Sequence, residues 1–428
     1  LMARSIQKNL SERIKDALRR VEGAFSIVAM TRTKLIGVRD ALGVRPLVLG
    51  RIGETGHVLA SETCALDIIG AEFVREIEPG EMVVIADGKV ESTRPFGPSK
   101  GRFCIFEHVY FSRPDSIIGG RSVYETRRQI GVELAREAPV EADLVCPVPD
   151  SGTPAAIGYA AESGIPYGMG IIRNQYMGRT FIEPTEQIRN MGVRLKLNVN
   201  RALIKGKRVI LVDDSVVRGT TSRKIKDMIL EAGAAEVHFR IASPPTAWPC
   251  FYGVDTPDRG KLLAAQMTED EMRDWIGVDS LKFISLDGLY RAAGEPQGRD
   301  KARPQYCDAC FSGDYPVAPS DRIEKGFGMK AAERRGSRSA SVRIISFVLW
   351  GSRARAIPKC SRPTWRPSST GGSGQRGAAP RRSRWSAPPT TSARHVRVGT
   401  ARPAPHRPRS NGSTPRMPRR WGCVRATA

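Results

Sequence analysis

The chain has 428 residues and a formal net charge of +24, from 68 Lys and Arg against 44 Asp and Glu. The excess lies at the C-terminal end, since residues 334–428 hold 21 Arg, one Lys and no Asp or Glu, which leaves +2 on the first 333 residues. The overall charge therefore gives no reason to expect nucleic-acid binding by that first part. No apolar run reaches the roughly 18 residues of a membrane span, and we expect a soluble, cytoplasmic protein of two or three domains.

Residues 1–95 show short apolar runs separated by turns, which predicts a β-rich domain. A helix is expected first, over residues 5–21, where Ile6, Leu10, Ile14 and Leu18 recur at helical spacing. The strand-like runs that follow are Ala24–Met30, Lys34–Val38, Leu47–Leu49, Val58–Ser61 and Met82–Ala86.

Residues 96–318 alternate between strand and helix patterns, which predicts an α/β domain with a doubly wound parallel sheet. The expected helices are Tyr124–Glu137, Pro154–Glu162, Arg223–Glu231 and Glu269–Ile276. The expected strands are Asp143–Val148, Tyr167–Ile172, Val209–Val212, Val237–Ile241 and Cys250–Val254.

The most informative stretch is residues 208–222, which read R-V-I-L-V-D-D-S-V-V-R-G-T-T-S. An apolar, β-branched run ends at Asp213 and Asp214, and a turn rich in hydroxyls and glycine leads into the next helix. Open α/β sheets bind ligands in loops of this kind, at the carboxyl ends of their strands. Free N–H groups, hydroxyls and a helix N-terminus suit a phosphate, while paired carboxylates suit sugar hydroxyls and a divalent cation.

The alternative is an ordinary Asp-Asp-Ser turn that caps a helix. The stretch, however, combines an acid pair, a glycine and a hydroxyl cluster, and in this it resembles the phosphoribosyl diphosphate (PRPP) motif of type I phosphoribosyltransferases. The resemblance implies a PRPP site formed by Asp213, Asp214, Ser215, Arg218, Gly219, Thr220, Thr221 and Ser222.

Residues 319–428 form an Arg-, Pro- and Ser-rich tail, which we expect to be disordered because it has too little apolar surface to fold. The abrupt loss of acidic residues and lysine is what a frameshift in GC-rich coding DNA produces. A basic tail that binds nucleic acid is the competing interpretation, although no pattern of aromatic residues among the basic ones supports it.

Further motifs occur in one order along the chain. They are C-I-F-E-H-V-Y-F-S-R-P-D-S at 104–116, P-D-S at 149–151, Y-M-G-R-T-F-I at 176–182 and the stretch at 208–222. Together they resemble the amidophosphoribosyltransferase family over roughly residues 5 to 317. The segments at 23–26, 37–47 and 60–63 resemble the later part of that family's N-terminal-nucleophile glutaminase domain, so the chain is expected to be N-terminally truncated, with a partial α+β glutaminase domain over 1–95.

The resemblance implies that ammonia, taken from glutamine in the intact family, replaces the diphosphate of PRPP to give 5-phosphoribosylamine, the first step of purine biosynthesis. Mg²⁺ would be held by Asp213 and Asp214 with Ser151. Arg173, Tyr176 and Arg179 would belong to a loop that closes over the substrate, excludes water and steadies the diphosphate. No general base is required, because ammonia is already a nucleophile.

The family's glutaminase nucleophile is a cysteine at the mature N-terminus, whose amine serves as base. Cys64 is internal and is expected to be a buried thiol, so this chain is expected to use ammonia only. Purine nucleotides as feedback inhibitors and a homo-oligomer are also implied. The rival functions are an inactive PRPP-binding regulator, a nucleic-acid-binding protein that uses the tail, and another phosphoribosyltransferase.

Four cysteines carry a second signal. Cys307 and Cys310 form a C-x-x-C pair, which in a cytosolic protein points to metal or redox chemistry rather than to a disulfide. With Cys104 and Cys250 the pair matches the four ligands of the 4Fe–4S cluster in the iron–sulfur branch of the family. The alternative is four unrelated buried thiols.

Overall fold

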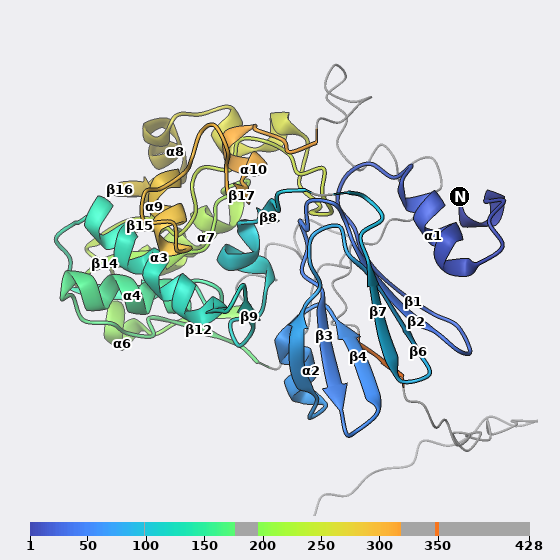
Figure 1. The fold of residues 1–428 in the computed structure, drawn as a ribbon. Helices are drawn as coiled ribbons and strands as arrows, with labels where there is room; N and C mark the ends of the chain where they lie inside the picture. The colour runs from blue at the N-terminus through green and yellow to red at the C-terminus, as the bar shows by residue number, and fades with distance from the viewer. Residues whose placement is uncertain (98, 176–195, 318–346, 351–428) are drawn as a thin grey trace, which may run out of the picture. The chain divides into compact units, whose positions relative to one another are not determined.

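The computed structural model describes residues 1–97, 99–175 and 196–317, together with strand β18 (Phe347–Trp350) (Figure 1). The chain divides into a unit of residues 1–359 and a second of residues 360–428, which lies outside the described residues. The expected disorder of residues 319–428 therefore stays a prediction. The described part of that region, β18, pairs antiparallel with β4 (Gly56–Ala60).

Two four-stranded antiparallel sheets form the β-rich part, in the strand orders β1-β2-β6-β7 and β18-β4-β3-β5. Apart from β4 and β18, their strands are β1 (Ser26–Met30), β2 (Leu35–Arg39), β3 (Val48–Ile52), β5 (Glu72–Glu76), β6 (Met82–Ala86) and β7 (Lys89–Thr93). The helices of this part are α1 (Leu10–Leu18) and α2 (Thr63–Ile68), after a short 3₁₀ turn at Met2–Arg4.

Side-chain alternation along the strands explains how these elements stack. Val83 and Ile85 of β6 face the other sheet and pack with residues such as Leu59, whereas Met82 and Val84 pack against α1. Helix α2 covers the outer face of the second sheet through Ala65 and Leu66. Because successive strand residues point to opposite faces, the result is a helix–sheet–sheet–helix sandwich. Cys64 is buried in α2, as predicted.

The α/β part is built on a parallel sheet with the strand order β11-β14-β15-β16. Its strands are β11 (Leu144–Pro147), β14 (Arg208–Asp213), β15 (Glu236–Ile241) and β16 (Ser280–Phe283). Its longer helices are α3 (Val123–Glu137), α4 (Thr153–Ser163), α7 (Thr220–Glu231), α8 (Glu269–Ile276) and α9 (Leu286–Ala292).

Helices cover both faces of this sheet (Figure 1). Val209 and Leu211 of β14 pack on the side of α7 and α8, while Ile210 and Val212 pack on the side of α3, α4 and α9. A strand buried on both faces is the signature of a doubly wound sheet, so the predicted fold class is confirmed.

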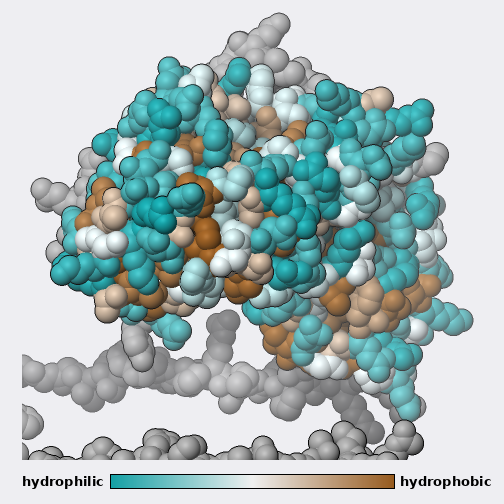
Figure 2. All heavy atoms as spheres, turned by 90° about the vertical axis from the view of Figure 1, so that its left-hand side faces the viewer, coloured by the Kyte–Doolittle hydropathy of each residue, from teal (hydrophilic) through white to brown (hydrophobic). Residues whose placement is uncertain are grey.

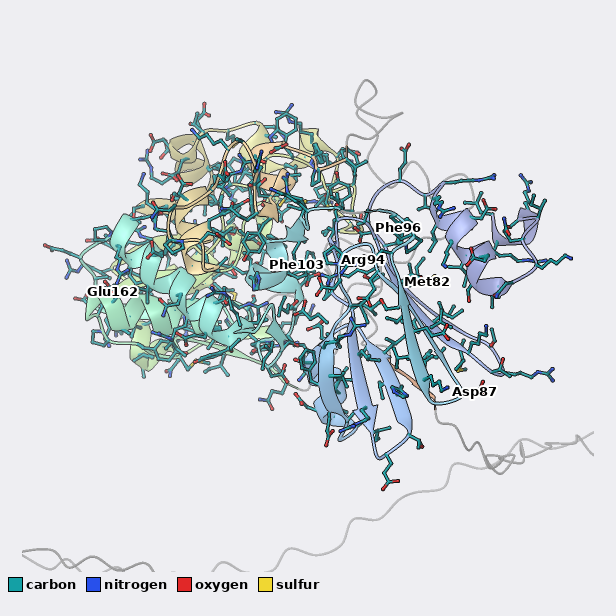
Figure 3. The ribbon with its side chains drawn as sticks, viewed as in Figure 1. Met82, Asp87, Arg94, Phe96, Phe103 and Glu162 are labelled. Carbon is teal, nitrogen blue, oxygen red and sulfur yellow. The ribbon has the colours of Figure 1, made fainter. Side chains whose placement is uncertain are left out.

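Short elements complete the α/β part. They are β8 (Phe103–Cys104), the π-helical turn η2 (Glu107–Phe111), β9 (Ile117–Ile118), β10 (Arg121–Ser122), β12 (Ile171–Arg173), β13 (Leu197–Val199), α6 (Arg201–Ile204), η3 (Arg259–Lys261), η4 (Leu263–Ala265), β17 (Tyr306–Cys307) and α10 (Ala309–Ser312). Figure 3 labels Arg94 and Phe96 after β7, and Phe103 in β8. The boundary predicted at residue 95 lies in this stretch and stays a prediction.

Buried polar contacts link the β-rich part to the α/β part. Arg45 donates from Nη1 to Oε1 of Glu107 over 2.8 Å, and the Glu107 side chain is fully buried. Glu62, in the S-E-T-C segment, accepts hydrogen bonds from the backbone N–H of Arg113 (2.8 Å) and the hydroxyl of Ser116 (2.9 Å). The family-like segments of the two parts therefore bind each other.

Two strand predictions were wrong. Of the stretch 167–172, only Ile171 and Ile172 lie in a strand, β12, which pairs antiparallel with β13 instead of joining the parallel sheet; Tyr167 makes an isolated bridge to Val145. Residues 250–254 form a loop, since the backbone N–H of Cys250 bonds to Oγ1 of Thr256 and Gly253 has φ +98°. The apolar side chains of this loop are buried against Cys104 and Cys307, which is why its sequence has the apolar pattern of a buried strand.

Candidate functional site

The acid pair lies at the carboxyl end of β14, in the middle of the parallel sheet. Asp213 and Asp214 are each 8% exposed, and the N–H of Asp214 donates to Oδ1 of Asp213 over 2.9 Å. Burial raises the pKa of Asp213 well above its usual value, and the charge of Asp214 raises it further. Two carboxylates held this close inside a protein favour a bound cation that compensates their charge.

The loop after β11 brings Ser151 to this pair. The Ser151 and Ser215 side chains hydrogen-bond to Asp214 and lower its pKa, against the larger effect of burial, which raises it. Gly152 makes this approach possible, because a Cβ there would lie 2.2 Å from the carbonyl oxygen of Val212. Two carboxylates and a hydroxyl therefore converge from adjacent strands. The Mg²⁺ site that the family resemblance implies for them stays a prediction.

Residues 214–219 connect β14 to α7, and Thr220, Thr221 and Ser222 are the first three residues of α7. Val216 is buried in the core, and the N–H of Leu263 donates to the carbonyl oxygen of Val217 over 2.9 Å. Gly219 has φ +68° and precedes the first residue of α7, which no side chain caps. A left-handed residue at this point is best supplied by glycine. The helix N-terminus thus carries N–H groups suited to an anion.

The predicted phosphate-binding side chains lie in this connection and in the first turn of α7. Arg218, Thr220 and Thr221 are exposed, while Ser222 is 4% exposed. The guanidinium of Arg223 lies 4.8 Å from the ring centre of Trp275, which fixes the first turn of α7 against α8.

Arg173 ends β12 and forms an ion pair with Asp150, the residue before Ser151. The end of β12 is thereby joined to the Ser151 loop. Tyr176 and Arg179, the other two predicted catalytic residues, lie outside the described residues.

Sequence reasoning missed Arg127 of α3. It is 5% exposed and donates from Nε to the carbonyl oxygen of His108 (2.8 Å) and from Nη2 to that of Ser112 (2.6 Å). Burial lowers the pKa of Arg127 to about 10, although the charge of Asp214 raises it. This positive charge therefore acts on the acid pair. Only its place in an E-T-R-R run, which is typical of a surface helix, was visible in the sequence.

The four predicted cysteine ligands come from segments that bind one another. Cys104 and Cys307 are partners in the parallel pair β8–β17. The N–H groups of Ala247 and Trp248, just before Cys250, both donate to the carbonyl oxygen of Cys310 over 3.1 Å. Burial raises the pKa of Cys310, and the other three thiols raise it further, so all four lie within electrostatic reach.

Both donor sets fit the groups that the sequence suggested. Within residues 1–97, 99–175 and 196–317, no three His, Cys, Asp or Glu side chains are grouped as ligands of one metal ion. Mg²⁺ needs only one or two carboxylates, because waters and substrate phosphates complete its shell. A 4Fe–4S cluster is held by four cysteine thiolates, each bound to a different iron, so cysteines that hold such a cluster need not be grouped around a single ion.

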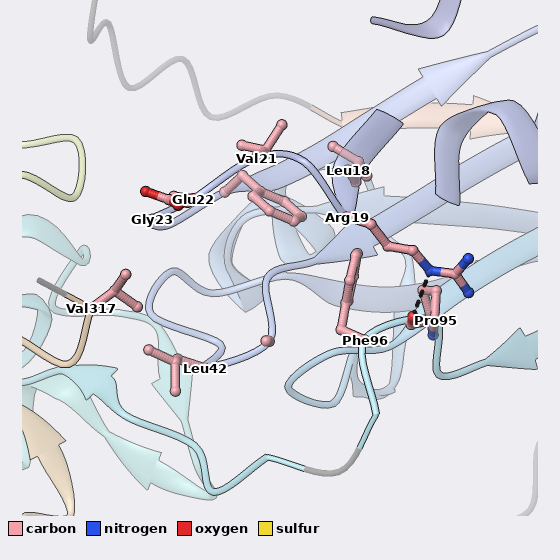
Figure 4. A pocket seen from close by; sticks show the side chains of 11 residues that line it. Leu18, Arg19, Val21, Glu22, Gly23, Leu42, Pro95, Phe96 and Val317 are labelled. Atoms are coloured by element: carbon pink, nitrogen blue, oxygen red, sulfur yellow. Dashed lines mark hydrogen bonds between the residues drawn. The ribbon is translucent and has the colours of Figure 1, made fainter. Parts of the chain in front are cut away.

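Two cavities in the described part of the chain lie away from the acid pair. One, of about 450 Å³, is lined by Leu18, Phe96, Val317 and neighbouring residues, and beside it Arg19 donates to the carbonyl oxygen of Pro95 over 3.2 Å (Figure 4). The other, of about 260 Å³, is lined by Arg39, His108 and Tyr306 among others. The face shown in Figure 2 is mainly hydrophilic with a few apolar patches. None of the described helices is long and apolar enough to cross a membrane.

A doubly wound parallel sheet with an acid pair and a hydroxyl-rich loop at the carboxyl end of a central strand defines a phosphoribosyltransferase-type domain. No family model matches the sequence. The chain is, however, 56% identical over 336 residues to an amidophosphoribosyltransferase of Rhizobium etli, covering 77% of this chain and 67% of that protein. It is 54% identical over 314 residues to the Mycobacterium tuberculosis protein of the same name, covering 72% of this chain and 58% of that protein. The chain belongs to the amidophosphoribosyltransferase family.

Two solved structures support the assignment to this family. The glutamine PRPP amidotransferase of B. subtilis, in complex with ADP and GMP, is 47% identical, with a TM-score of 0.70 and coverage of 75% of this chain and 70% of that one. A structure described as the allosteric regulatory enzyme of purine biosynthesis gives 47% identity and a TM-score of 0.70, with coverage of 76% and 69%. The chain spans 57 to 67% of the length of the curated relatives it matches.

Proposed function

We propose that the chain catalyses phosphoribosyl transfer from PRPP to ammonia, yielding 5-phosphoribosylamine and diphosphate. The observation that carries the proposal is the convergence of Asp213, Asp214 and Ser151 beside the uncapped N-terminus of α7. One end of this site offers hard oxygen ligands and the other offers N–H donors. A phosphorylated sugar diphosphate has the complementary groups.

Each part of the site has a distinct task. Asp213, Asp214 and Ser151 would hold Mg²⁺, which as a Lewis acid stabilises the departing diphosphate. The N–H groups and hydroxyls of residues 215–222 bind the 5-phosphate and fix the sugar. The bond from C1 to the diphosphate oxygen breaks, the bond from C1 to the ammonia nitrogen forms, and the nitrogen then releases a proton. Positioning supplies most of the rate, since ammonia needs no activation.

Arg173 has a further task in this proposal, together with Tyr176 and Arg179. Its ion pair with Asp150 keeps its guanidinium beside the Ser151 loop. From there it can exchange the carboxylate for the diphosphate, whose charge it then stabilises. The segment that follows would exclude water from the reacting carbon.

Further proposals concern cofactor, regulation and location. Cys104, Cys250, Cys307 and Cys310 would hold a 4Fe–4S cluster, which ties the C-terminal segment of the α/β part to its body. We also propose a cytoplasmic location, where thiols such as Cys307 and Cys310 stay reduced. The B. subtilis relative in complex with ADP and GMP suggests that purine nucleotides also bind here, and we propose a homo-oligomer.

The test is an assay of diphosphate release from PRPP with ammonium chloride and Mg²⁺. Wild-type protein is expected to release diphosphate. The double variant D213N/D214N should release it at a rate at least about 10²-fold lower, as is typical when a stabilising group at a reacting centre is lost. Wild-type protein that binds PRPP but releases no diphosphate with ammonia would be a PRPP sensor, and the proposed activity would be wrong.

A further inference from the structure

A carboxylate with no assigned role lies between two of the proposed cluster ligands. Asp308 separates Cys307 from the turn that holds Cys310, and its side chain is fully buried. Tyr290 donates its hydroxyl to Oδ2 over 2.8 Å, and Ser312 donates its hydroxyl to Oδ1 over 2.7 Å. Arg299 donates from Nε to Oδ2 over 2.5 Å. A buried carboxylate satisfied this fully has one conformation.

The groups around Asp308 are themselves fixed from several directions. Arg299 also donates from Nη2 to Oδ2 of Asp314 over 2.6 Å, and its backbone N–H donates to Oδ1 of Asp287 over 2.9 Å. Tyr290 is fully buried in α9. Asp308 is thus anchored to α9 and to the segment before β17, and both anchors are independent of the four cysteines.

Asp308 in turn fixes the cysteine turn. It precedes the first residue of α10, and its carbonyl oxygen accepts from the N–H groups of Phe311 (2.8 Å) and Ser312 (3.0 Å). Side chain and backbone of one residue therefore determine the turn that carries both Cys307 and Cys310. Flexible ligands would lose conformational entropy on binding a cluster, whereas a turn that is already fixed loses little.

Charge gives a second reason for the arrangement. Four thiolates around a cluster form a region of negative charge, to which an unpaired Asp308 would add. The ion pair with Arg299, whose side chain is 12% exposed, compensates the carboxylate. Removing Arg299 would leave the buried charge of Asp308 uncompensated beside the cysteines.

We propose that Asp308, held by Tyr290, Arg299 and Ser312, is a positioning residue that fixes the Cys307–Cys310 turn for an iron–sulfur cluster. The inference rests on the cluster proposed above and assigns to Asp308 the part that outer-shell partners of metal ligands play. Loss of such a partner typically weakens metal binding by about 10- to 100-fold.

Two tyrosines provide a matched test. Y290F removes the hydroxyl that donates to Asp308, and Y159F removes a hydroxyl that donates over the same 2.8 Å to the carbonyl oxygen of Ala138. Both tyrosines are fully buried. The readouts are iron and acid-labile sulfide per chain, and the rate at which the cluster's visible absorbance decays with a chelator. Thermal unfolding of the cluster-free proteins reports on the fold.

We expect Y290F to lose its cluster about 10-fold faster than wild type, while Y159F retains the wild-type rate and the two cluster-free variants unfold alike. D308N should lose the cluster faster still. Equal rates of cluster loss in wild type, Y290F and D308N would overturn the role of Asp308 but not the cluster proposal. The role of Asp308 would also be overturned if Y290F and Y159F lost the cluster equally fast. Wild-type protein without iron after anaerobic reconstitution would overturn the cluster proposal itself, and this inference with it.

Discussion

Gly219 is the position where the loop of the proposed PRPP site depends most directly on backbone geometry. Its φ of +68° is a conformation that costs a non-glycine residue about 1–2 kcal/mol. An added Cβ would also lie 2.7 Å from Cζ3 of Trp275 and 2.8 Å from Cδ2 of Leu263. Crowding of this kind adds about 1–3 kcal/mol. The substitution G219A should therefore lower the free energy of unfolding by about 2–5 kcal/mol, the sum of the two costs.

Gly206 serves as the control for this prediction. Its φ is +73°, and an added Cβ would meet no atom within 4 Å. G206A should therefore lower the free energy of unfolding by only the backbone cost of about 1–2 kcal/mol. The two variants differ in crowding alone, so their difference isolates the contact of the loop with Trp275 and Leu263.

Urea unfolding followed by circular dichroism measures both variants, and calorimetry measures their binding of PRPP with Mg²⁺. G219A should also bind PRPP more weakly, because the added Cβ pushes the first turn of α7 away from Trp275 and Leu263. G206A should bind PRPP as the wild type does. Equal destabilisation by the two substitutions, or unchanged PRPP binding by G219A, would refute the reasoning.

Two further predictions concern buried groups in the contact between the β-rich and α/β parts. E107Q breaks the buried ion pair with Arg45 and should lower the free energy of unfolding in urea by about 3–5 kcal/mol. E72Q breaks an exposed ion pair of the same 2.8 Å length and should change the free energy of unfolding by less than about 1 kcal/mol. Equal destabilisation by E107Q and E72Q would contradict the burial of the Glu107 pair. Burial lowers the pKa of His108 to about 4. As the pH falls, this histidine is therefore protonated near pH 6.5 in the unfolded chain but only near pH 4 in the folded chain. Wild-type stability should consequently fall relative to H108Q by up to about 3 kcal/mol between pH 6.5 and 4; parallel pH profiles of the two proteins would exclude this.

The acid pair shows how far sequence alone reaches. A short β-branched run that ends at Asp213 and Asp214 predicts a buried strand, and β14 ends at Asp213. The expected helix at Arg223 begins three residues earlier, at Thr220. Gly219 starts it there through a left-handed backbone, which the glycine allows but does not by itself reveal. Residues of the parallel strands alternate between two apolar faces, which is why an unbroken apolar run predicts a strand buried on both sides.

Residues whose role depends on distant partners were not predictable in the same way. Arg127 has the sequence context of a surface helix, and only the packing of α3 against η2 buries its guanidinium. The sequence around Asp308 likewise does not reveal its role, because its partners Tyr290 and Arg299 come from other elements. The strand predicted at residues 250–254 was wrong because the apolar side chains there pack around thiols and not in a sheet. The positive φ of Gly253 is incompatible with a regular strand at this point.

The most direct test of the central claim is calorimetric titration of Mg²⁺–PRPP into the wild-type chain and into D213N/D214N. The claim is that the acid pair, the Ser151 loop and the N-terminus of α7 form one PRPP site. It predicts saturable binding by the wild type and none by the double variant, with folding of the variant checked by circular dichroism. Undiminished binding by D213N/D214N would contradict the account.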